Sequence, residues 1–188
     1  MKVFLLFSGG IDSTSLIRYY LDSNFEVKLI WIDYDQKPAK MENKAIDRIS
    51  EYYSIDLLKI HTGIKKPQID NFEYLGRNLM FFSVALMNFP FKNGLISAGI
   101  RLNPRYLDCF EIFIIQIRNM IEFLSRGEIS VDFPLMKSSK LLTLRYSLKN
   151  QVPLEYTYSC DVGTNPSCNV CPSCIEVQTA YRELSSHE

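Results

Sequence analysis

The sequence predicts an α/β fold in which helices cover a doubly wound parallel sheet. Short apolar runs alternate with segments of helical spacing, as in repeated strand–helix–strand units. The first apolar run passes directly into a glycine-containing turn, which is typical of folds that bind an anion between a strand and a helix. Four of the five cysteines lie close together near the C-terminus. We therefore expect one domain over residues 1–188, including a four-cysteine segment at 157–184.

The first part of the chain is expected to form a βαβαβ unit. Residues 3–7 are a continuously apolar run that suits a strand buried on both faces. Apolar residues recur at helical spacing over 12–21 and 40–53, and the apolar runs at 27–32 and 56–60 indicate two further strands. Because each strand is followed by a helix, the strands are expected to run parallel.

The rest of the chain continues this alternation. We expect a helix near 78–87, a strand at 95–98, an apolar helix from about 108 to 124, a helix over 138–150 and a last helix from about 175. The most apolar stretch, at 110–124, is too short to span a membrane and is interrupted by Glu111 and Arg118. We expect this helix to be buried or to form a dimer interface.

The composition allows a sizeable core and excludes two classes of partner. Hydrophobic residues make up 47% of the chain, and 21 Lys and Arg balance 21 Asp and Glu. A net charge of zero gives no general attraction to nucleic acid or to an anionic membrane. We therefore expect no membrane partner and no direct binding of nucleic acid. Because the glycine turn comes within the first ten residues, we expect no signal peptide and a cytoplasmic protein.

Residues 8–13 read Ser-Gly-Gly-Ile-Asp-Ser and predict a pyrophosphate-binding loop. Glycine lets the backbone approach an anion, while the hydroxyls of Ser8, Ser13 and Thr14 and the amides of the helix N-terminus can donate to it. Two other common phosphate loops, Gly-x-x-x-x-Gly-Lys-Ser/Thr and Gly-x-Gly-x-x-Gly, do not occur here. Asp12 would repel phosphate unless a cation lay between them, so it implies a magnesium nucleotide. The alternative is an ordinary capped turn.

Two pairs of polar residues are further candidates for the same edge of the sheet. Tyr34 and Gln36 follow the second strand, and ligands of doubly wound sheets bind at the carboxyl ends of the strands. These side chains would contact adenine and ribose; the alternative is a polar turn. Arg77 and Asn78 lie at the start of a predicted helix. Arginine offers a planar fork to phosphate or carboxylate, and the alternative for this pair is simple helix capping.

The clustered cysteines predict a metal site. Cys168, Cys171 and Cys174 form C-x-x-C-x-x-C, and Cys160 precedes them. In a reducing cytoplasm, four such thiolates favour a structural Zn²⁺ in a zinc knuckle over disulfide bonds. An iron–sulfur cluster is the main alternative, and a role without metal is another. The fifth cysteine, Cys109, is expected to be a buried free thiol.

The loop at 8–13, the segment at 76–78 and the cysteine tetrad together resemble the 7-cyano-7-deazaguanine synthase (QueC) family over nearly the whole chain. The loop alone is similar to that of any ATP pyrophosphatase, or PP-loop enzyme. Tyr34, Gln36 and the pair Asp108-Cys109 also match. The resemblance implies a sheet of the adenine nucleotide alpha hydrolase-like (HUP) type, in a single PP-loop ATP pyrophosphatase domain.

The resemblance also implies a reaction and its residues. A homodimeric, cytoplasmic enzyme would use ATP, Mg²⁺ and a structural Zn²⁺ to convert 7-carboxy-7-deazaguanine and ammonia to 7-cyano-7-deazaguanine (preQ0), a queuosine precursor. The reaction would form AMP through an acyl adenylate. Asp12 would place Mg²⁺, and Arg77 and Lys140 would offset developing charge. The nucleotide would contact Phe7, Ser8, Gly9, Gly10, Asp12, Ser13, Thr14, Tyr34 and Gln36, and the deazapurine carboxylate would contact Arg77, Asn78, Arg101 and Asp108.

The segment that would recognise the base departs from the family pattern. Acidic residues usual near 100–102 are absent, which leaves Asp108 as an acceptor, whereas Arg101 and Arg105 would favour an anionic group. A second hypothesis is therefore a QueC-like enzyme that adenylates another carboxylate or transfers a deazaguanine in a defence or nucleic-acid modification system. Two further hypotheses are tRNA thiolation through a persulfide-bearing cysteine and a non-catalytic nucleotide-binding subunit.

Overall fold

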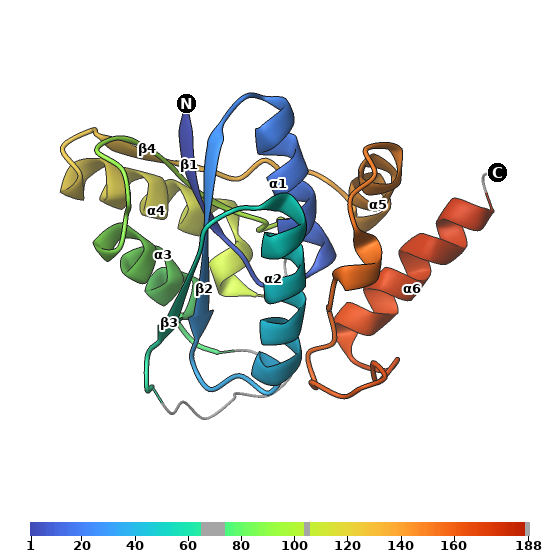
Figure 1. Cartoon of the computed structure of the whole chain (residues 1–188). Helices are drawn as coiled ribbons and strands as arrows, with labels where there is room; N and C mark the ends of the chain where they lie inside the picture. The colour runs from blue at the N-terminus through green and yellow to red at the C-terminus, as the bar shows by residue number, and fades with distance from the viewer. Residues whose placement is uncertain (65–73, 104–105, 187–188) are drawn as a thin grey trace.

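A computed structural model describes residues 1–64, 74–103 and 106–186, which form a five-stranded parallel sheet covered by helices (Figure 1). The strands are β1 Lys2–Leu6, β2 Glu26–Asp33, β3 Leu57–His61, β4 Gly94–Ala98 and β5 Ile129–Asp132. They pair in the order β3-β2-β1-β4-β5, and each pair is parallel. This is the strand order of a doubly wound sheet, so the predicted fold class is confirmed.

Different helices cover the two faces of the sheet. The helices nearest the sheet are α1 Ile11–Asp22, α2 Ala39–Tyr53, α3 Arg77–Met87 and α4 Glu111–Leu124. Strand β1 shows the division, because Phe4 faces the core beneath α3 and α4, while Val3 and Leu5 face the core beneath α1 and α2. All three side chains are buried, as expected for a strand that is apolar throughout.

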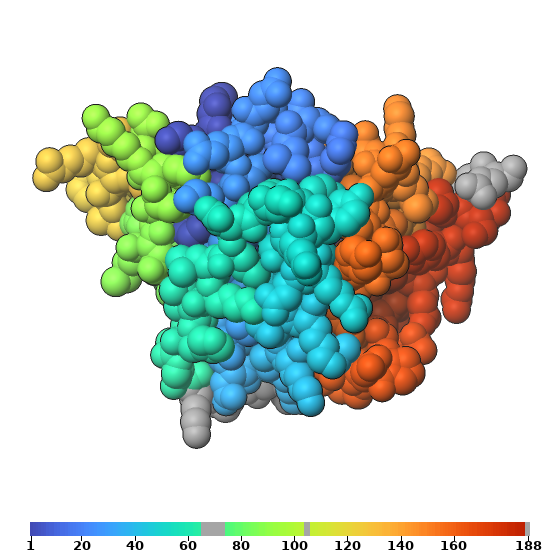
Figure 2. All heavy atoms as spheres, in the orientation of Figure 1, coloured from blue at the N-terminus to red at the C-terminus, as the bar shows by residue number. Residues whose placement is uncertain are grey.

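The C-terminal part of the chain packs beside α1. It contains α5 Lys140–Lys149 and α6 Pro172–Ser185, which contact each other. Two short 3₁₀ helices precede α4 and the cysteine segment, η2 Leu107–Cys109 and η3 Leu154–Tyr156. In the space-filling view, the orange and red C-terminal segments lie against the blue and cyan surface of the first part of the chain (Figure 2).

The structure differs from the sequence prediction at two elements. Strand β5 is absent from the prediction because it spans only four residues, of which Ile129 and Val131 are buried; an alternating pattern this short is easily missed. Helix α6 begins at Pro172 rather than near residue 175. Proline is favoured in the first turn of a helix, where its missing N–H is not needed. As a result, Cys174 lies in the first turn of α6.

The strand order leaves a crevice at the centre of the sheet. Strands β1 and β4 are neighbours, but the chain continues from them to opposite sides of the sheet. The segments that follow their carboxyl ends therefore diverge, and ligands of doubly wound sheets bind at this point. Within the described ranges, no helix is both long and apolar enough to cross a membrane.

Candidate functional site

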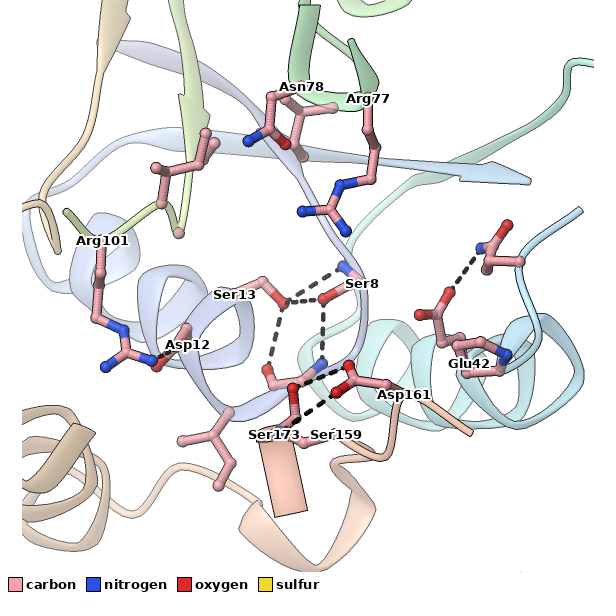
Figure 3. A pocket seen from close by; sticks show the side chains of 18 of the residues that line it. Ser8, Asp12, Ser13, Glu42, Arg77, Asn78, Arg101, Ser159, Asp161 and Ser173 are labelled. Carbon is pink, nitrogen blue, oxygen red and sulfur yellow. Dashed lines mark hydrogen bonds and ion pairs between the residues drawn. The ribbon is translucent and has the colours of Figure 1, made fainter. Parts of the chain in front are cut away.

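A cavity of about 720 Å³ opens at the carboxyl ends of β1, β2 and β4. The start of α1 borders it on one side, and residues 158–161 together with the start of α6 border it on another (Figure 3). The predicted site residues that line it are Phe7, Ser8, Gly10, Asp12, Ser13, Tyr34, Gln36, Arg77, Asn78, Arg101, Lys140 and Cys160. Its volume falls within the usual range for small-molecule sites.

In the loop between β1 and α1, the side chains of Ser8 and Ser13 lie against each other (Figure 3). Ser8 N donates to Ser13 Oγ over 3.3 Å, and the two hydroxyl oxygens also lie 3.3 Å apart. Gly9 has a φ of +76°, and a Cβ there would lie 3.0 Å from Ala45 Cβ, so both conformation and packing require glycine. Ser8 and Gly10 face the cavity from the N-terminus of α1, where a negative charge is favoured.

Two residues of the loop do not reach the cavity, contrary to expectation. Thr14 is fully buried, and its Oγ1 donates to Gly10 O over 2.8 Å. A threonine within a helix often bonds in this way to the preceding turn, and the bond uses its only hydroxyl proton. Gly9 also lies outside the cavity wall. Its carbonyl accepts from Tyr158 N over 2.9 Å, which joins the loop to the C-terminal segment.

Two cations and two carboxylates meet beside the loop. Lys140 Nζ lies 2.6 Å and Arg101 Nη2 lies 3.4 Å from Asp12 Oδ2. Glu176 on α6 binds the same cations, with its Oε2 2.7 Å from Arg101 Nη2 and 3.7 Å from Lys140 Nζ. Burial raises the pKa of Glu176, but the hydrogen bond from Arg101 and the charge of Lys140 lower it overall. The cluster is electrically balanced and holds both cations at the cavity wall.

Asp12 fits the predicted magnesium in part. Its Oδ2 is engaged by Lys140 and Arg101, whereas its Oδ1 has no hydrogen-bond partner among the described residues. A carboxylate oxygen is a ligand that Mg²⁺ prefers, so Oδ1 has the right chemistry. Because protein atoms cover Oδ1, a cation can bind there only after the side chain has shifted.

Arg77 reaches into the cavity from the start of α3, and in Figure 3 its guanidinium points toward Ser8. Its Nε is buried and makes no hydrogen bond within the described ranges. Burial lowers the pKa of Arg77, but Tyr34 and the nearby charge of Asp108 raise it overall, so the side chain stays charged. A half-buried guanidinium that lines the cavity, with its Nε buried and unbonded among the described residues, favours an anion there.

Asp108 has a different role from the one expected. It does not line the described cavity wall; its Oδ2 accepts from Asn78 N over 3.3 Å, and its carbonyl accepts from Asn78 Nδ2 over 3.1 Å. Asp108 therefore caps α3 and joins it to η2, while its predicted contact with a substrate stays a prediction. Arg105, the other basic residue expected nearby, lies outside the described residues.

Cys109 is a free thiol as expected, but it is half-buried rather than buried, and it lines the cavity. Burial and the neighbouring Asp108 raise its pKa to about 12. The thiol is therefore protonated at neutral pH, and a protonated thiol is a poor nucleophile. This weighs against tRNA thiolation, because the other four cysteines are gathered in the tetrad.

The side chain of Gln36 forms hydrogen bonds that join the end of β2, the turn after it and α2. Its Oε1 accepts from Tyr34 N over 2.9 Å, and its Nε2 donates to Ile32 O over 3.3 Å and to Glu42 Oε2 over 2.8 Å. Both amide hydrogens are used, so Gln36 has none left for a ribose or a base. Tyr34 is buried against Tyr74 and Phe81, and burial raises its pKa to about 12.

The four clustered cysteines converge as predicted. The Sγ atoms of Cys160, Cys168, Cys171 and Cys174 all lie within 4.8 Å of one another. Four sulfurs about 2.3 Å from one tetrahedral ion would be about 3.8 Å apart, so the geometry suits a single metal ion. Burial raises the pKa of Cys160, but backbone hydrogen bonds such as that from Cys168 N lower it to about 5. Asn169 adopts a left-handed φ of +62°, which asparagine tolerates in such a turn.

Three acidic residues of the cavity wall are absent from the predicted site: Glu42, Asp161 and Glu176. Glu42 lies on α2, Asp161 receives two hydrogen bonds from Ser173, and Glu176 completes the charge cluster. An acidic residue on an amphipathic helix normally reads as part of the solvated face. The sequence signal for two of them is their nearness to the tetrad, since Asp161 follows Cys160 directly and Glu176 lies two positions after Cys174.

The sequence of the chain matches a known protein family. A family model described as "Queuosine biosynthesis protein QueC" matches residues 2–70 and 65–185. A protein from Desulfitobacterium hafniense named "7-cyano-7-deazaguanine synthase 1" is 29% identical over 204 aligned positions, which cover 96% of this chain and 91% of that protein. A "7-cyano-7-deazaguanine synthase" from Thermoplasma volcanium is 27% identical and covers 92% of this chain and 83% of that protein.

A solved structure supports the fold alone. It is titled as a predicted subunit of tRNA methyltransferase from Methanocaldococcus jannaschii, and it superposes with a TM-score of 0.52 at 18% identity. The match covers 79% of this chain and 74% of that one.

Proposed function

The chain belongs to the QueC family, and from this premise we propose that it makes 7-cyano-7-deazaguanine from 7-carboxy-7-deazaguanine, ammonia and ATP. Relatives that carry the name of this synthase are similar over 92% or more of the chain. The observation that carries the proposal is that one cavity joins the Ser8–Ser13 loop to three cations, Arg77, Arg101 and Lys140. Anionic phosphates and a carboxylate substrate both suit such a site. The proposal places the enzyme in the cytoplasm, where the cysteines stay reduced.

The loop and the charge cluster would bind different parts of ATP. The Gly10 amide, the Ser8 hydroxyl and the N-terminus of α1 would hold the departing pyrophosphate. Lys140 and Arg101 are held at the wall by carboxylates and can turn toward phosphate oxygens when the nucleotide arrives. Mg²⁺, when bound, would neutralise charge on the pyrophosphate, and Asp12 is the residue that would hold it.

The reaction needs two activations in one cavity. An oxygen of the substrate carboxylate attacks the α-phosphorus of ATP, and pyrophosphate leaves with the bonding electrons. Ammonia attacks the acyl carbon, and loss of a proton and AMP gives the amide. The amide oxygen then attacks the α-phosphorus of a second ATP and pyrophosphate leaves. Loss of AMP and protons gives the nitrile. Arg77 would stabilise the negative charge that develops opposite the loop.

The tetrad would hold Zn²⁺ as a structural ion. Four protein sulfurs leave no open position on a tetrahedral metal, so the ion would not touch the substrates. Its contribution would be to fix residues 158–161 and the start of α6, which form part of the cavity wall.

The products of ATP test this proposal. With Mg²⁺, 7-carboxy-7-deazaguanine and an ammonium salt, we expect AMP and pyrophosphate in equal amounts, together with the nitrile. Chromatography of the nucleotides and mass spectrometry of the deazapurine measure both. Reactions without the deazapurine are the control. ADP and phosphate as products would contradict the assignment, and AMP formation without a nitrile would favour a QueC-like enzyme that transfers the deazaguanine or adenylates another carboxylate.

The proposal includes a homodimer formed through α4. The outer face of this helix carries exposed apolar side chains, namely Ile112, Ile115, Met120, Phe123 and Leu124, and Phe123 is 82% exposed. Several exposed apolar residues on one helix favour an interaction surface there. We expect light scattering to give the mass of a dimer and Phe123→Asp to give a monomer. Leu148→Asp, on the exposed side of α5, should leave the dimer intact; a monomeric parent protein would refute this part of the proposal.

A further inference from the structure

Glu42 is a carboxylate of the cavity wall that the proposed reaction does not use. It projects from α2 toward the turn after β2 (Figure 3). Its Oε2 accepts two hydrogen bonds, from Trp31 Nε1 over 3.0 Å and from Gln36 Nε2 over 2.8 Å. Gln36 Oε1 in turn accepts a hydrogen bond from Tyr34 N, so a chain of hydrogen bonds fixes the position of the carboxylate.

The second oxygen of this carboxylate is available to a ligand. No described residue donates a hydrogen bond to Glu42 Oε1, whereas both known donors reach Oε2. Burial raises the pKa of Glu42 overall, although the hydrogen bonds from Gln36 and Trp31 and the nearby charge of Arg77 favour the carboxylate. The two hydrogen bonds orient the group, and Glu42 lines the same cavity as Arg77.

The surroundings of Glu42 suit a flat ring. Trp31 donates to Glu42, Tyr34 and Phe81 line the same cavity, and aromatic walls favour planar heterocycles. An acceptor and a donor on one wall match a ring edge that presents an N–H beside an acceptor atom. Both bases of the proposed reaction have such an edge: adenine offers its 6-amino group beside N1, and the deazaguanine offers N1–H and its 2-amino group beside O6.

We propose that Glu42 Oε1 accepts a hydrogen bond from an N–H on the ring edge of a bound purine-type base and thereby selects that base. The assignment rests on the proposed function, and it supplies the acidic acceptor that the residues near 100–102 lack. Asp108, the acceptor expected from the sequence, is occupied by the cap of α3. Glu42 is thus a specificity-determining residue that takes no part in bond making.

The substitution Glu42→Gln tests the assignment because it should invert the polarity of the contact. Trp31 and Gln36 both donate to Oε2, so the amide oxygen of glutamine must occupy that position. The amide NH₂ then points toward the cavity, where it donates instead of accepting. A variant that only weakened the local structure would bind all ligands less well and would show no inversion.

Calorimetry with two pairs of ligands provides the readout. The first pair is ATP and ITP, as α,β-methylene analogues, which differ in a 6-amino or 6-oxo group. The second pair is 7-carboxy-7-deazaguanine and its 2-oxo counterpart. In one pair, the parent protein should prefer the amino ligand by about tenfold or more, and Glu42→Gln should reverse that preference. The pair that responds identifies the base that Glu42 contacts.

Glu51→Gln is the matched control, since it makes the same change on α2 at an exposed residue outside the cavity. It should keep the ligand preference of the parent protein. Unchanged preferences in Glu42→Gln, with both ligands still bound, would overturn this assignment alone. Failure of the parent protein to bind either class of ligand would overturn the proposed function together with it.

Discussion

Replacing Cys171 by serine is expected to leave little folded protein. Cys171 is buried, and its Sγ is one of four within 4.8 Å of one another. Metal binding to such sites is coupled to folding and contributes about 10 kcal/mol or more in small zinc domains, which is comparable to the whole stability of a domain. Loss of one thiolate should therefore unfold the C-terminal segment. Soluble yield, thermal melting and metal content by elemental analysis measure the effect.

Cys109→Ser is the matched control for this experiment, because Cys109 is the cysteine outside the tetrad. It should retain the metal and melt close to the parent protein. The parent protein, purified without oxygen, should contain one Zn²⁺ per chain. Iron with sulfide, or a Cys171→Ser variant that folds and melts normally without metal, would show that the tetrad does not have the structural role proposed.

Replacing Asp12 by asparagine is expected to lower turnover by about 100- to 1000-fold while the fold is retained. The substitution keeps the shape of the side chain but removes the charge that holds Lys140 Nζ at 2.6 Å and Arg101 Nη2 at 3.4 Å. It also removes the carboxylate proposed to hold Mg²⁺. The rate of AMP formation at saturating ATP, compared with circular dichroism and melting, separates loss of chemistry from loss of structure.

The control for Asp12→Asn lies on the same helix. Asp22 also pairs with an arginine, but its ion pair with Arg18 is exposed and distant from the cavity. Exposed pairs contribute about 1 kcal/mol or less, so Asp22→Asn should leave turnover unchanged. An Asp12→Asn variant with near-normal turnover would contradict the role given to the charge cluster.

The sequence was most informative where one local pattern decides the structure. The apolar run at 3–7, the glycine turn and the helix after it are set by neighbouring residues, and the structure contains them. The cysteine spacing likewise predicts a cluster because the segment is short and the ligands are few. Strand β5 depends on pairing with β4 rather than on its own four residues, so its sequence gave little sign of it.

The polar contacts of the site were harder to predict because they join distant parts of the chain. Sequence alone could not show that Asp108 caps α3 or that Gln36 donates both amide hydrogens to Ile32 and Glu42. Nor could it show that Glu176 meets Arg101 from a helix 75 positions away. Residue type indicates what a side chain can bind, but only the fold decides which partner reaches it first.

The hydrogen bond from Tyr158 N to Gly9 O has a consequence for biosynthesis. The strand and loop that begin the site leave the ribosome before the wall that contains Tyr158 and Glu176. A nascent chain therefore carries an incomplete cavity, without the segment at 158–161 and without the carboxylate of Glu176. Ribosome-bound chains that end before residue 158 should not yet hold a nucleotide tightly, so the assembled site would itself report that synthesis has passed α6.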